Sequence, residues 1–375
     1  MPNGELVMKV VYFGSYDDRV SPRVRQLREG LRRAGVEVVE CRAQGRALPR
    51  YAKLLSALPR AARGADVLLV GKPGQREMPL AAALARTFRL PLAFDCFASL
   101  YVNEVLERQR VARGSFQAWK LAQLDRFALR HADLGLVDTL AHGRLIAATL
   151  LPASAGAAPL RRVFVGAEEQ FRPLPPPNDA EPLEALFVAT FIPFQGADVI
   201  LRAAALLRRE RRLRFTLLGH GQTRAAMVAL AAELRLDNVR FEAPLPYAAL
   251  PERIARAGLC LGHFGDSPTA RAVIPKKVFA ALASARAAVT ADGPGVREAL
   301  DATTAFLCRP GDPEDLAATL RRALEDPAER EAVAQRGRAL HERLFTTEAV
   351  GRACRDVLAE CVRGRARAGA LEAVS

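Results

Sequence analysis

Short apolar segments alternate with longer amphipathic segments along most of the chain. The short segments are rich in valine, leucine and phenylalanine, whereas the longer ones repeat their apolar residues at helical spacing. Buried parallel strands are nearly continuous apolar runs, and each is joined to the next by a helix. The alternation therefore predicts βαβ units and an α/β fold built on parallel sheets.

The predicted strands form two sets of six, which indicates two similar doubly wound domains. The strands expected in the first half are Val7–Tyr16, Val36–Cys41, Val67–Gly71, Pro91–Phe97, Leu134–Asp138 and Arg162–Val165. The strands expected in the second half are Ala185–Phe191, Arg214–Leu218, Val239–Glu242, Leu259–His263, Ala287–Ala291 and Ala305–Cys308.

A proline-rich segment separates the two sets of strands. Phe171–Leu183 contains five prolines, and proline fixes φ and removes a backbone donor, so we expect a stiff, extended connector. Further along, Asp312 followed by Pro313 is typical of a helix start. From there the chain is expected to be helical to about Arg363, with the last ten or so residues frayed.

The composition excludes an intrinsically disordered chain and a small disulfide-stapled module, because the chain has 375 residues and 50% of them are hydrophobic. Its six cysteines are scattered without a Cys-x-x-Cys pair, which argues against a disulfide framework or a zinc site and fits a reducing cytoplasm. The N-terminal residues lack the pattern of a secretory signal, and no apolar run is long enough to span a bilayer. We expect a cytoplasmic protein, for which a peripheral position on a membrane stays open.

The net charge of +14 is unevenly distributed. Residues 1–170 hold 26 basic and 16 acidic side chains, whereas residues 171–375 hold 29 and 25. Three interpretations remain: nucleic acid, an anionic membrane surface or lipid-linked substrate, and an arginine-rich composition that leaves only a solvated surface. Nucleic acid is the least favoured, because the basic residues are spread over helices without an aromatic-interleaved patch.

Three predicted turns carry residues suited to phosphate or sugar. Gly14 and Ser15 follow the first strand, and Gly219-His220-Gly221 follows a strand of the second half, where glycine lets backbone amides approach an anion. Pro275 suits the first turn of a helix, which places Lys276 and Lys277 there, although cations oppose the helix dipole at that end. A bound diphosphate would remove this conflict; two solvated lysines are the alternative.

Several side chains are candidates for acid–base chemistry. Asp95 ends a predicted strand and could take a proton from an acceptor hydroxyl, or serve as a turn residue. His142 could pair with Asp138 or cap a helix start. In the second half, His220, His263 and Asp266 are similar candidates.

A predicted helix over Ser115–Arg130 carries a stripe of large apolar residues. They recur at helical spacing, with Lys120, Arg126 and Arg130 on the flanks. Such a stripe usually belongs to the core; an interfacial position of Trp119 is the alternative. The stripe residues are Phe116, Trp119, Leu124 and Phe127.

Several segments of the chain have an order and spacing typical of one known family. In the second half they are Phe187–Gly196, Leu217–Gly221, Val239–Phe241 with Leu245–Leu250, Ala257–Leu261, Ile274–Val289, Asp292–Glu298 and Pro310–Pro313. In the first half they are Gly71–Gln75, Phe94-Asp95, Ser99–Tyr101, Ala132–Thr139 with His142, and Val165–Ala167. Together they resemble the retaining GT-B glycosyltransferases, in particular glycosyltransferase family 4, over nearly all of the second half and also in the first.

The resemblance implies two Rossmann-like domains that face one another across a cleft. Residues 1–172 would bind the acceptor, 173–182 would be the linker, and 183–345 would bind a nucleotide-sugar donor. A helix over about 347–362 would pack back on the first domain. No cofactor or metal is implied, since the nucleoside diphosphate sugar is a substrate.

The resemblance also implies roles for individual residues. Asp95, His142 and Lys277 are the catalytic candidates, with Lys277 stabilising the leaving diphosphate. The donor-binding candidates, including those from the turns above, are Gly14, Ser15, Thr190, Phe191, Gln195, Gly219, His220, Gly221, Leu245, Pro246, Asp266, Ile274, Pro275, Lys276 and Lys277.

Three departures set this chain apart from family 4. The two glutamates of the family's Glu-x7-Glu motif correspond to Ala272 and Ala280, and neither alanine can bind sugar or ribose hydroxyls. Thr190 and Gln195 stand where the family has basic residues for the diphosphate. The glycine and proline that follow the second glutamate are Ala285 and Ala287, so we expect the helix end and the next strand to be altered.

We predict a metal-independent retaining glycosyltransferase of the hexosyltransferase type. It would transfer a sugar from a nucleoside diphosphate sugar to a glycan or lipid-linked acceptor in polysaccharide or glycolipid synthesis, at the inner face of the plasma membrane if the basic half binds anionic lipid. The alternative is a degenerate GT-B binding or scaffold protein without transferase activity. The donor base, the sugar, the acceptor and the oligomeric state are left open by the sequence.

Overall fold

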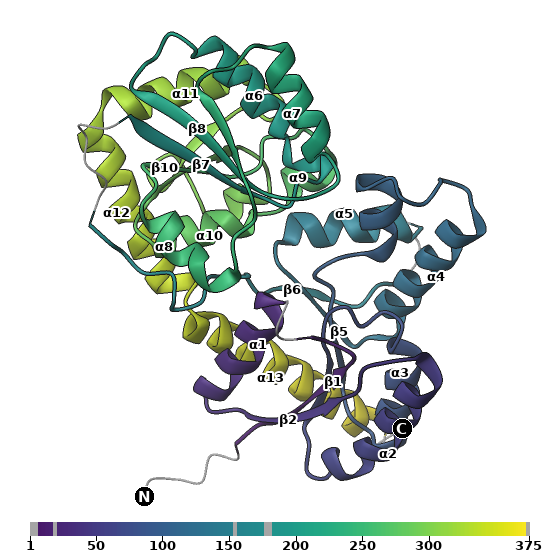
Figure 1. The fold of residues 1–375 in the computed structure, drawn as a ribbon. Coiled ribbons are helices and arrows are strands. Elements are labelled where there is room, and N and C mark those ends of the chain that lie inside the picture. Colours follow the sequence, from purple (N-terminus) through teal and green to yellow (C-terminus); the bar gives the residue numbers. More distant parts are fainter. Residues whose placement is uncertain (1–6, 18–20, 153–155, 176–181, 373–375) are drawn as a thin grey trace, which may run out of the picture. The chain divides into compact units, whose positions relative to one another are not determined.

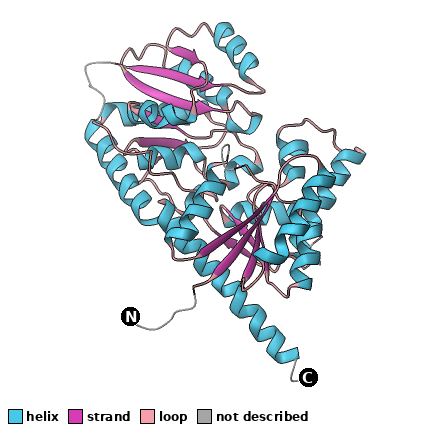
Figure 2. Cartoon of the chain, turned by 60° about the horizontal axis from the view of Figure 1, so that its bottom comes forward, coloured by secondary structure: helices cyan, strands magenta, loops and turns pink. Residues whose placement is uncertain are grey.

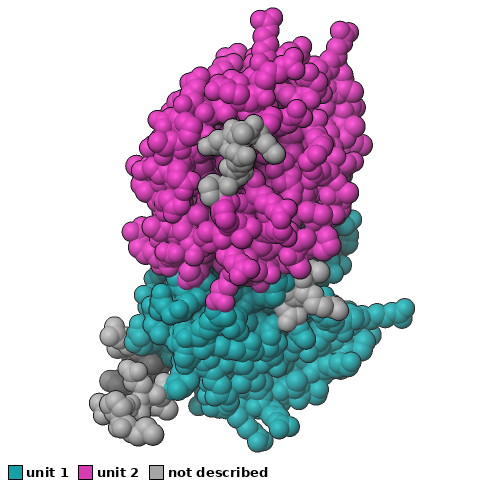
Figure 3. Space-filling view, turned by 60° about the vertical axis from the view of Figure 1, so that its left-hand side comes forward, with its two compact units in different colours: residues 1–165, 347–375 teal, residues 166–346 magenta. Residues whose placement is uncertain are grey.

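The computed structural model describes residues 7–17, 21–152, 156–175 and 182–372, with side chains up to residue 365. It divides the chain into two compact units, coloured separately in Figure 3. Unit 1 comprises residues 1–165 and 347–375, and unit 2 comprises residues 166–346. Part of the expected linker, residues 176–181, lies outside the described residues.

Unit 1 is built on a parallel sheet of six strands in the order β2-β1-β3-β4-β5-β6 (Figure 1). The first five predicted strands are present, whereas the sixth lies at Leu160–Arg162 instead of the expected Arg162–Val165. The strands are β1 (Lys9–Gly14), β2 (Glu37–Arg42), β3 (Val67–Val70), β4 (Leu92–Asp95), β5 (Leu134–Val137) and β6 (Leu160–Arg162). The helices are α1 (Pro22–Arg33), α2 (Ala47–Ala61), α3 (Met78–Thr87), α4 (Phe116–His131), α5 (Leu140–Leu150) and α13 (Thr347–Glu372), with a π-helical turn at Val102–Glu107.

Alternate residues of the strands face two helical layers, as the two-residue period of a strand requires. Val11 and Phe13 of β1 pack with the layer formed by α2 to α5, whereas Val10 and Tyr12 pack with α1 and α13. Helices α1 and α13 cross so closely that a Cβ on Gly351 would lie 2.0 Å from the carbonyl carbon of Gly30. The final helix is therefore an integral layer of unit 1.

Unit 2 is built on a second parallel sheet, in the order β12-β11-β10-β7-β8-β9, and each predicted strand of the second half is present. Figure 2 shows the strands of the chain in magenta among the cyan helices. The strands are β7 (Leu183–Ala189), β8 (Leu213–Gly219), β9 (Val239–Glu242), β10 (Leu259–Leu261), β11 (Ala287–Ala291) and β12 (Phe306–Cys308). The helices are α6 (Ala197–Leu206), α7 (Arg224–Glu233), α8 (Leu250–Ala255), α9 (Pro268–Ala272), α10 (Lys276–Ala283), α11 (Pro313–Glu325) and α12 (Pro327–Leu344), with 3-10 turns at Pro193–Gln195, Tyr247–Ala249 and Val296–Glu298.

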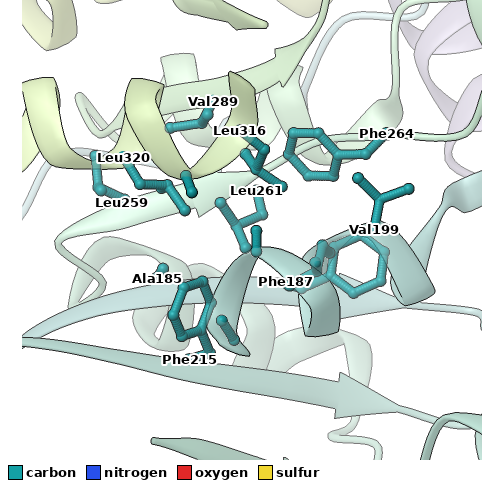
Figure 4. Close-up of a cluster of buried hydrophobic side chains, with 14 of the residues drawn as sticks. Ala185, Phe187, Val199, Phe215, Leu259, Leu261, Phe264, Val289, Leu316 and Leu320 are labelled. Carbon is teal, nitrogen blue, oxygen red and sulfur yellow. The ribbon is translucent and has the colours of Figure 1, made fainter. Parts of the chain in front are cut away.

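The core of unit 2 lies between its sheet and helices α6 and α11. Figure 4 shows Phe187, Phe215 and Leu261 of the strands against Val199 of α6 and Leu316 of α11. Helix α11 begins as the sequence predicts, because the Asp312 carboxylate accepts hydrogen bonds from the backbone amides of Glu314 and Asp315.

Four further expectations are corrected by the structure. The two domains are not alike in topology: unit 2 has the order 3-2-1-4-5-6 counted within the unit, whereas unit 1 has 2-1-3-4-5-6. Helix α13 continues to Glu372 instead of fraying after about Arg363. Phe116 and Trp119 are exposed rather than in the core. Finally, Ala285 adopts φ +50°, so it takes the left-handed conformation that glycine favours, and both the end of α10 and strand β11 are retained.

Candidate functional site

The candidate site of unit 2 lies where its strand order reverses, between β7 and β10. In open parallel sheets, ligands bind outside the carboxyl ends of the strands at this switch point. The segments that meet there are the loop after β7, the loop after β10 and the start of α10. The sequence had assigned donor binding to residues in each of these segments.

Backbone contacts hold these loops together. The Phe264 amide donates to the carbonyl of Gln195 at 3.0 Å, and the Thr223 amide donates to the carbonyl of Phe191 at 2.8 Å. Gly221 adopts φ +151° and lies so close to the loop after β7 that a Cβ would approach the Thr190 carbonyl oxygen to 1.9 Å. Phe191 itself has φ +38°, a strained conformation of the kind that clusters at ligand sites.

Lys277 is the most unusual side chain of this site. Its Nζ is buried, lies 3.7 Å from the centroid of the Phe187 ring and has no hydrogen-bond partner among the described residues. Burial lowers the pKa of Lys277 well below its ordinary value. An ammonium in this position lacks an anionic partner that a bound ligand could supply.

Two further buried polar atoms at this site have no partner among the described residues. One is Nδ1 of His263, whose ring packs edge-on against Phe194 at 5.2 Å; burial and the neighbouring Lys277 lower its pKa well below the ordinary value. The other is Oε1 of Gln195, whose amide nitrogen donates to Thr190 Oγ1 at 3.0 Å. Buried polar groups are normally hydrogen-bonded, so three such atoms in one place indicate a ligand site.

The other donor-binding candidates surround this cluster in the fold. Ile274 and Pro275 are buried before α10, and Lys276 is exposed in its first turn. Asp266 is exposed and forms an ion pair with Arg271. The remaining candidates of unit 2 are Gly219, buried at the end of β8, and His220, Leu245 and Pro246, which are exposed.

The two motif positions carry no functional group. Ala272 and Ala280 are 4% and 6% exposed, so neither a carboxylate nor a space open to solvent is present there. A donor bound at this site would have to be held by Lys277, Gln195 and backbone amides.

In unit 1, Asp95 forms a buried ion pair with Arg23. Arg23 Nη2 lies 2.8 Å from Asp95 Oδ1, both side chains are at most 1% exposed, and Arg23 Nη1 also donates to the Val163 carbonyl at 2.7 Å. Although burial opposes its charge, Asp95 raises the pKa of Arg23 above the ordinary value. This contact favours a structural role for Asp95 over proton transfer.

His142 lies beside Asp138. Its Nδ1 is 2.6 Å from Asp138 Oδ1, whereas the helix cap is provided by Thr139, whose hydroxyl accepts from the His142 amide at 3.1 Å. Despite burial, His142 and Arg23 keep the pKa of Asp138 below its ordinary value. The structure thus decides between the two alternatives for His142 in favour of the His–Asp pair.

The turn after β1 places Ser15 against a carboxylate that the sequence did not reveal. Ser15 Oγ donates to Glu77 Oε1 at 2.9 Å, and Gly14 packs against the backbone of Gly71. Glu77 is 1% exposed and also faces Arg50, whose Nε is 3.2 Å away.

Three residues of these sites were missed by sequence reasoning: Arg23, Glu77 and Phe187. None of the three offered a local signal, since their partners come from elements distant in the sequence. Within the described residues, no group of three or more His, Cys, Asp or Glu side chains is placed to hold a metal ion.

Comparison with known proteins shows a family similarity within unit 2. Residues 168–340 match the family model described as "Glycosyl transferases group 1". The chain is 34% identical over 186 residues to D-inositol 3-phosphate glycosyltransferase from Thermomonospora curvata, a match that covers 45% of this chain. The chain thus spans only 40% of the length of this curated relative.

Solved structures match the whole fold at low sequence identity. HepE of Anabaena in complex with UDP-glucose has a TM-score of 0.69 and 15% identity, covering 94% of this chain and 100% of that one. Sucrose-phosphate synthase from Thermosynechococcus elongatus has a TM-score of 0.64 and 17% identity, covering 98% and 100%. The chain therefore has the GT-B fold, and its residues 168–340 are similar to the glycosyl transferases group 1 domain.

Proposed function

We propose that the protein is a glycosyltransferase that transfers a sugar from a nucleoside diphosphate sugar to an acceptor hydroxyl. The observation that carries this proposal is the Lys277 ammonium, which is buried at the switch point of unit 2 without a hydrogen-bond partner in the part of the chain that the structure describes. A diphosphate is the ligand class that supplies such a cation with charge and hydrogen-bond acceptors. The structural neighbour HepE, which was solved with UDP-glucose, supports a nucleotide sugar as the donor.

The proposed mechanism is metal-independent and retains the anomeric configuration, as in glycosyltransferase family 4. As the bond between the sugar and the diphosphate breaks, negative charge grows on the leaving phosphate. Lys277 offsets this charge, and its burial strengthens the effect because the local dielectric is low. His142, oriented by Asp138, lies at the start of α5 and is the proposed polar contact to the substrate from unit 1.

We further propose a cell-surface glycan or glycolipid as the acceptor, with the protein on the cytoplasmic side of the plasma membrane. The support is the excess of basic side chains in residues 1–170, which suits an anionic lipid or lipid diphosphate. No described helix has the length and apolar character needed to cross a bilayer. Contact with the membrane would then be peripheral.

The second candidate function is a binding or scaffold protein that retains the fold without the reaction. The observation that favours it is the pair Ala272 and Ala280 in place of motif glutamates. The two candidates differ in chemistry rather than in donor binding, so binding alone does not separate them.

Titration calorimetry with UDP, GDP and ADP and their common sugar conjugates tests the proposal first. Binding of one diphosphate series is expected, and the absence of heat with all of them at millimolar concentration would overturn the proposal. Release of free sugar from the bound donor, measured by chromatography, then separates the enzyme from the scaffold. The scaffold predicts that the bound donor stays intact.

A further inference from the structure

Helix α4 presents two large aromatic side chains to solvent at its first turn. Phe116 is 76% exposed and Trp119 is 55% exposed, and their rings stack with centroids 5.5 Å apart. Figure 1 shows α4 in the helical layer on one face of the unit 1 sheet. Exposed tryptophan and phenylalanine in direct contact form an apolar patch, and a contiguous patch of this kind marks an interaction site more often than a single exposed residue does.

Local contacts hold this patch in place. Ser115 caps the helix by accepting a hydrogen bond from the Ala118 amide at 3.1 Å. With the Gln123 amide turned so that its oxygen faces the donors, that oxygen lies 3.0 Å from the Trp119 indole nitrogen and 3.0 Å from Arg126 Nη1. The indole N–H is then satisfied on the helix itself, while the apolar ring surface remains exposed.

The sequence that flanks the patch is basic, although Arg108 and Arg110 lie within 4.0 Å of the Glu104 carboxylate. Residues 108–124 contain four arginine or lysine side chains and no acidic one. Arg113 and Lys120 are exposed beside the two rings. The next acidic residue, Asp125, is buried and accepts hydrogen bonds from Ser99 Oγ and the amides of Leu100 and Tyr101.

A second helix of the same layer has the same character. Helix α2 exposes Leu48 and Leu55, and residues 41–65 hold six basic side chains and no acidic one. Because α2 and α4 both follow strands of a parallel sheet and pack on the same face, both begin at the carboxyl edge of that sheet. Gly14 and Ser15 end the first strand at this same edge.

We propose that Phe116, Trp119, Arg113 and Lys120, here called the α4 surface, dock unit 1 on an anionic lipid bilayer. The aromatic rings would enter the boundary between headgroups and acyl chains, while the cations pair with anionic headgroups. This inference rests on the proposed peripheral membrane association, and it identifies the residues that would contact the bilayer. It also places the carboxyl edge of the unit 1 sheet next to the bilayer, where a lipid-linked acceptor resides.

The charge pattern favours a bilayer over a nucleic acid. Single-stranded nucleic acids bind along grooves in which several aromatic rings alternate with cations, whereas the α4 surface has one stacked pair on a convex helix. A flat anionic surface needs only the exposed rings and flanking cations.

Trp119 makes the proposal directly measurable, because it is the only tryptophan of the chain. Its fluorescence is recorded while the full-length protein is titrated with vesicles of phosphatidylcholine alone or with 30% phosphatidylglycerol. A blue shift and protection from acrylamide are expected with the anionic vesicles only. Unchanged Trp119 emission at saturating anionic lipid would overturn the proposal. Quenching of Trp119 fluorescence by single-stranded oligonucleotides, without a response to the vesicles, would overturn it as well.

Vesicle co-sedimentation extends the test to variants without tryptophan. F116S together with W119S is expected to reduce binding to anionic vesicles at least tenfold, and R113Q together with K120Q to weaken it and reduce its salt dependence. The matched control is V228S, which removes an exposed apolar side chain from α7 of unit 2 and should bind as the parent does. Equal binding by all variants would contradict the assignment to α4.

The same variants distinguish this inference from the proposed catalytic function. The α4 surface belongs to unit 1, whereas Lys277 and the buried polar atoms around it belong to unit 2, so nucleotide binding measured by calorimetry in the absence of lipid should be unchanged. Loss of lipid binding with intact nucleotide binding would support the α4 surface alone. Intact lipid binding by the parent protein without nucleotide binding would support the proposal for the α4 surface and overturn the proposed glycosyltransferase function.

Discussion

Replacing Lys277 by methionine separates the stability of unit 2 from its ligand affinity. Methionine keeps the length and apolar stem of the side chain and removes the ammonium that lies over Phe187 without a hydrogen-bond partner among the described residues. Leaving a buried polar group unpaired costs about 1–3 kcal/mol, and the contact with the aromatic ring returns about 0.5–2 kcal/mol. We therefore expect K277M to raise the free energy of unfolding by about 1 kcal/mol.

The effect on ligand binding has the opposite sign. Without the ammonium, the diphosphate loses its buried cation, so the affinity for the nucleotide should fall at least tenfold, about 1.4 kcal/mol. For the stability measurement the matched control is K276M, because Lys276 is the exposed neighbour in the same helical turn. In K276M the free energy of unfolding should change by less than about 0.5 kcal/mol.

The stability gain should depend on pH. Burial lowers the pKa of Lys277 in the folded protein, so between that pKa and about 10.4 the unfolded chain binds the proton more strongly than the native one. The stability of the parent protein therefore rises with pH across this window. Consequently the excess of the unfolding free energy of K277M over that of the parent is largest at low pH and disappears above about pH 10.4.

Urea denaturation followed by circular dichroism measures the unfolding free energies, and calorimetry measures the nucleotide affinities. Destabilisation of K277M by more than about 1 kcal/mol would refute the argument, because it would mean that the ammonium has a favourable partner in the ligand-free protein. Unchanged nucleotide affinity would place the diphosphate elsewhere.

Five further substitutions make three tests, of which two concern packing and backbone conformation and one concerns pH dependence. G351A should destabilise the protein by about 3 kcal/mol, because its Cβ would meet the backbone of α1 at 2.0 Å, whereas G364A in the same helix has nothing within 4 Å and should be neutral or stabilising in thermal unfolding. A285G should stabilise by about 1 kcal/mol by relieving φ +50°, while A283G, inside α10, should destabilise by about 1 kcal/mol in the same urea assay. Burial lowers the pKa of His341 to about 4, so the folded protein loses stability as the pH falls from 6.5. H341L should remove about 3 kcal/mol of this pH dependence. If the unfolding free energies of parent and H341L change with pH in parallel, the prediction is wrong.

The candidate site was only partly accessible from the sequence. The Pro275–Lys277 helix start was readable, because proline and cations near a helix N-terminus have a local physical meaning. The contact of Lys277 with Phe187, the lack of a hydrogen-bond partner for its ammonium among the described residues, and the pairing of Asp95 with Arg23 depend on residues far apart in the chain. No local pattern encodes such contacts.

The sequence by itself determined eleven of the twelve strands, because a buried parallel strand must be an apolar run and each run is set off by a helical segment. It also determined the start of α11, since Asp312 caps the helix through contacts with its own neighbours. Tertiary structure alone decided the two different strand orders, the exposure of Phe116 and Trp119, and the left-handed conformation of Ala285. The physical reason is the distance along the chain over which each interaction acts. Capping hydrogen bonds and the spacing of apolar residues are set within one element, whereas strand order and burial depend on which distant elements pack in the same layer.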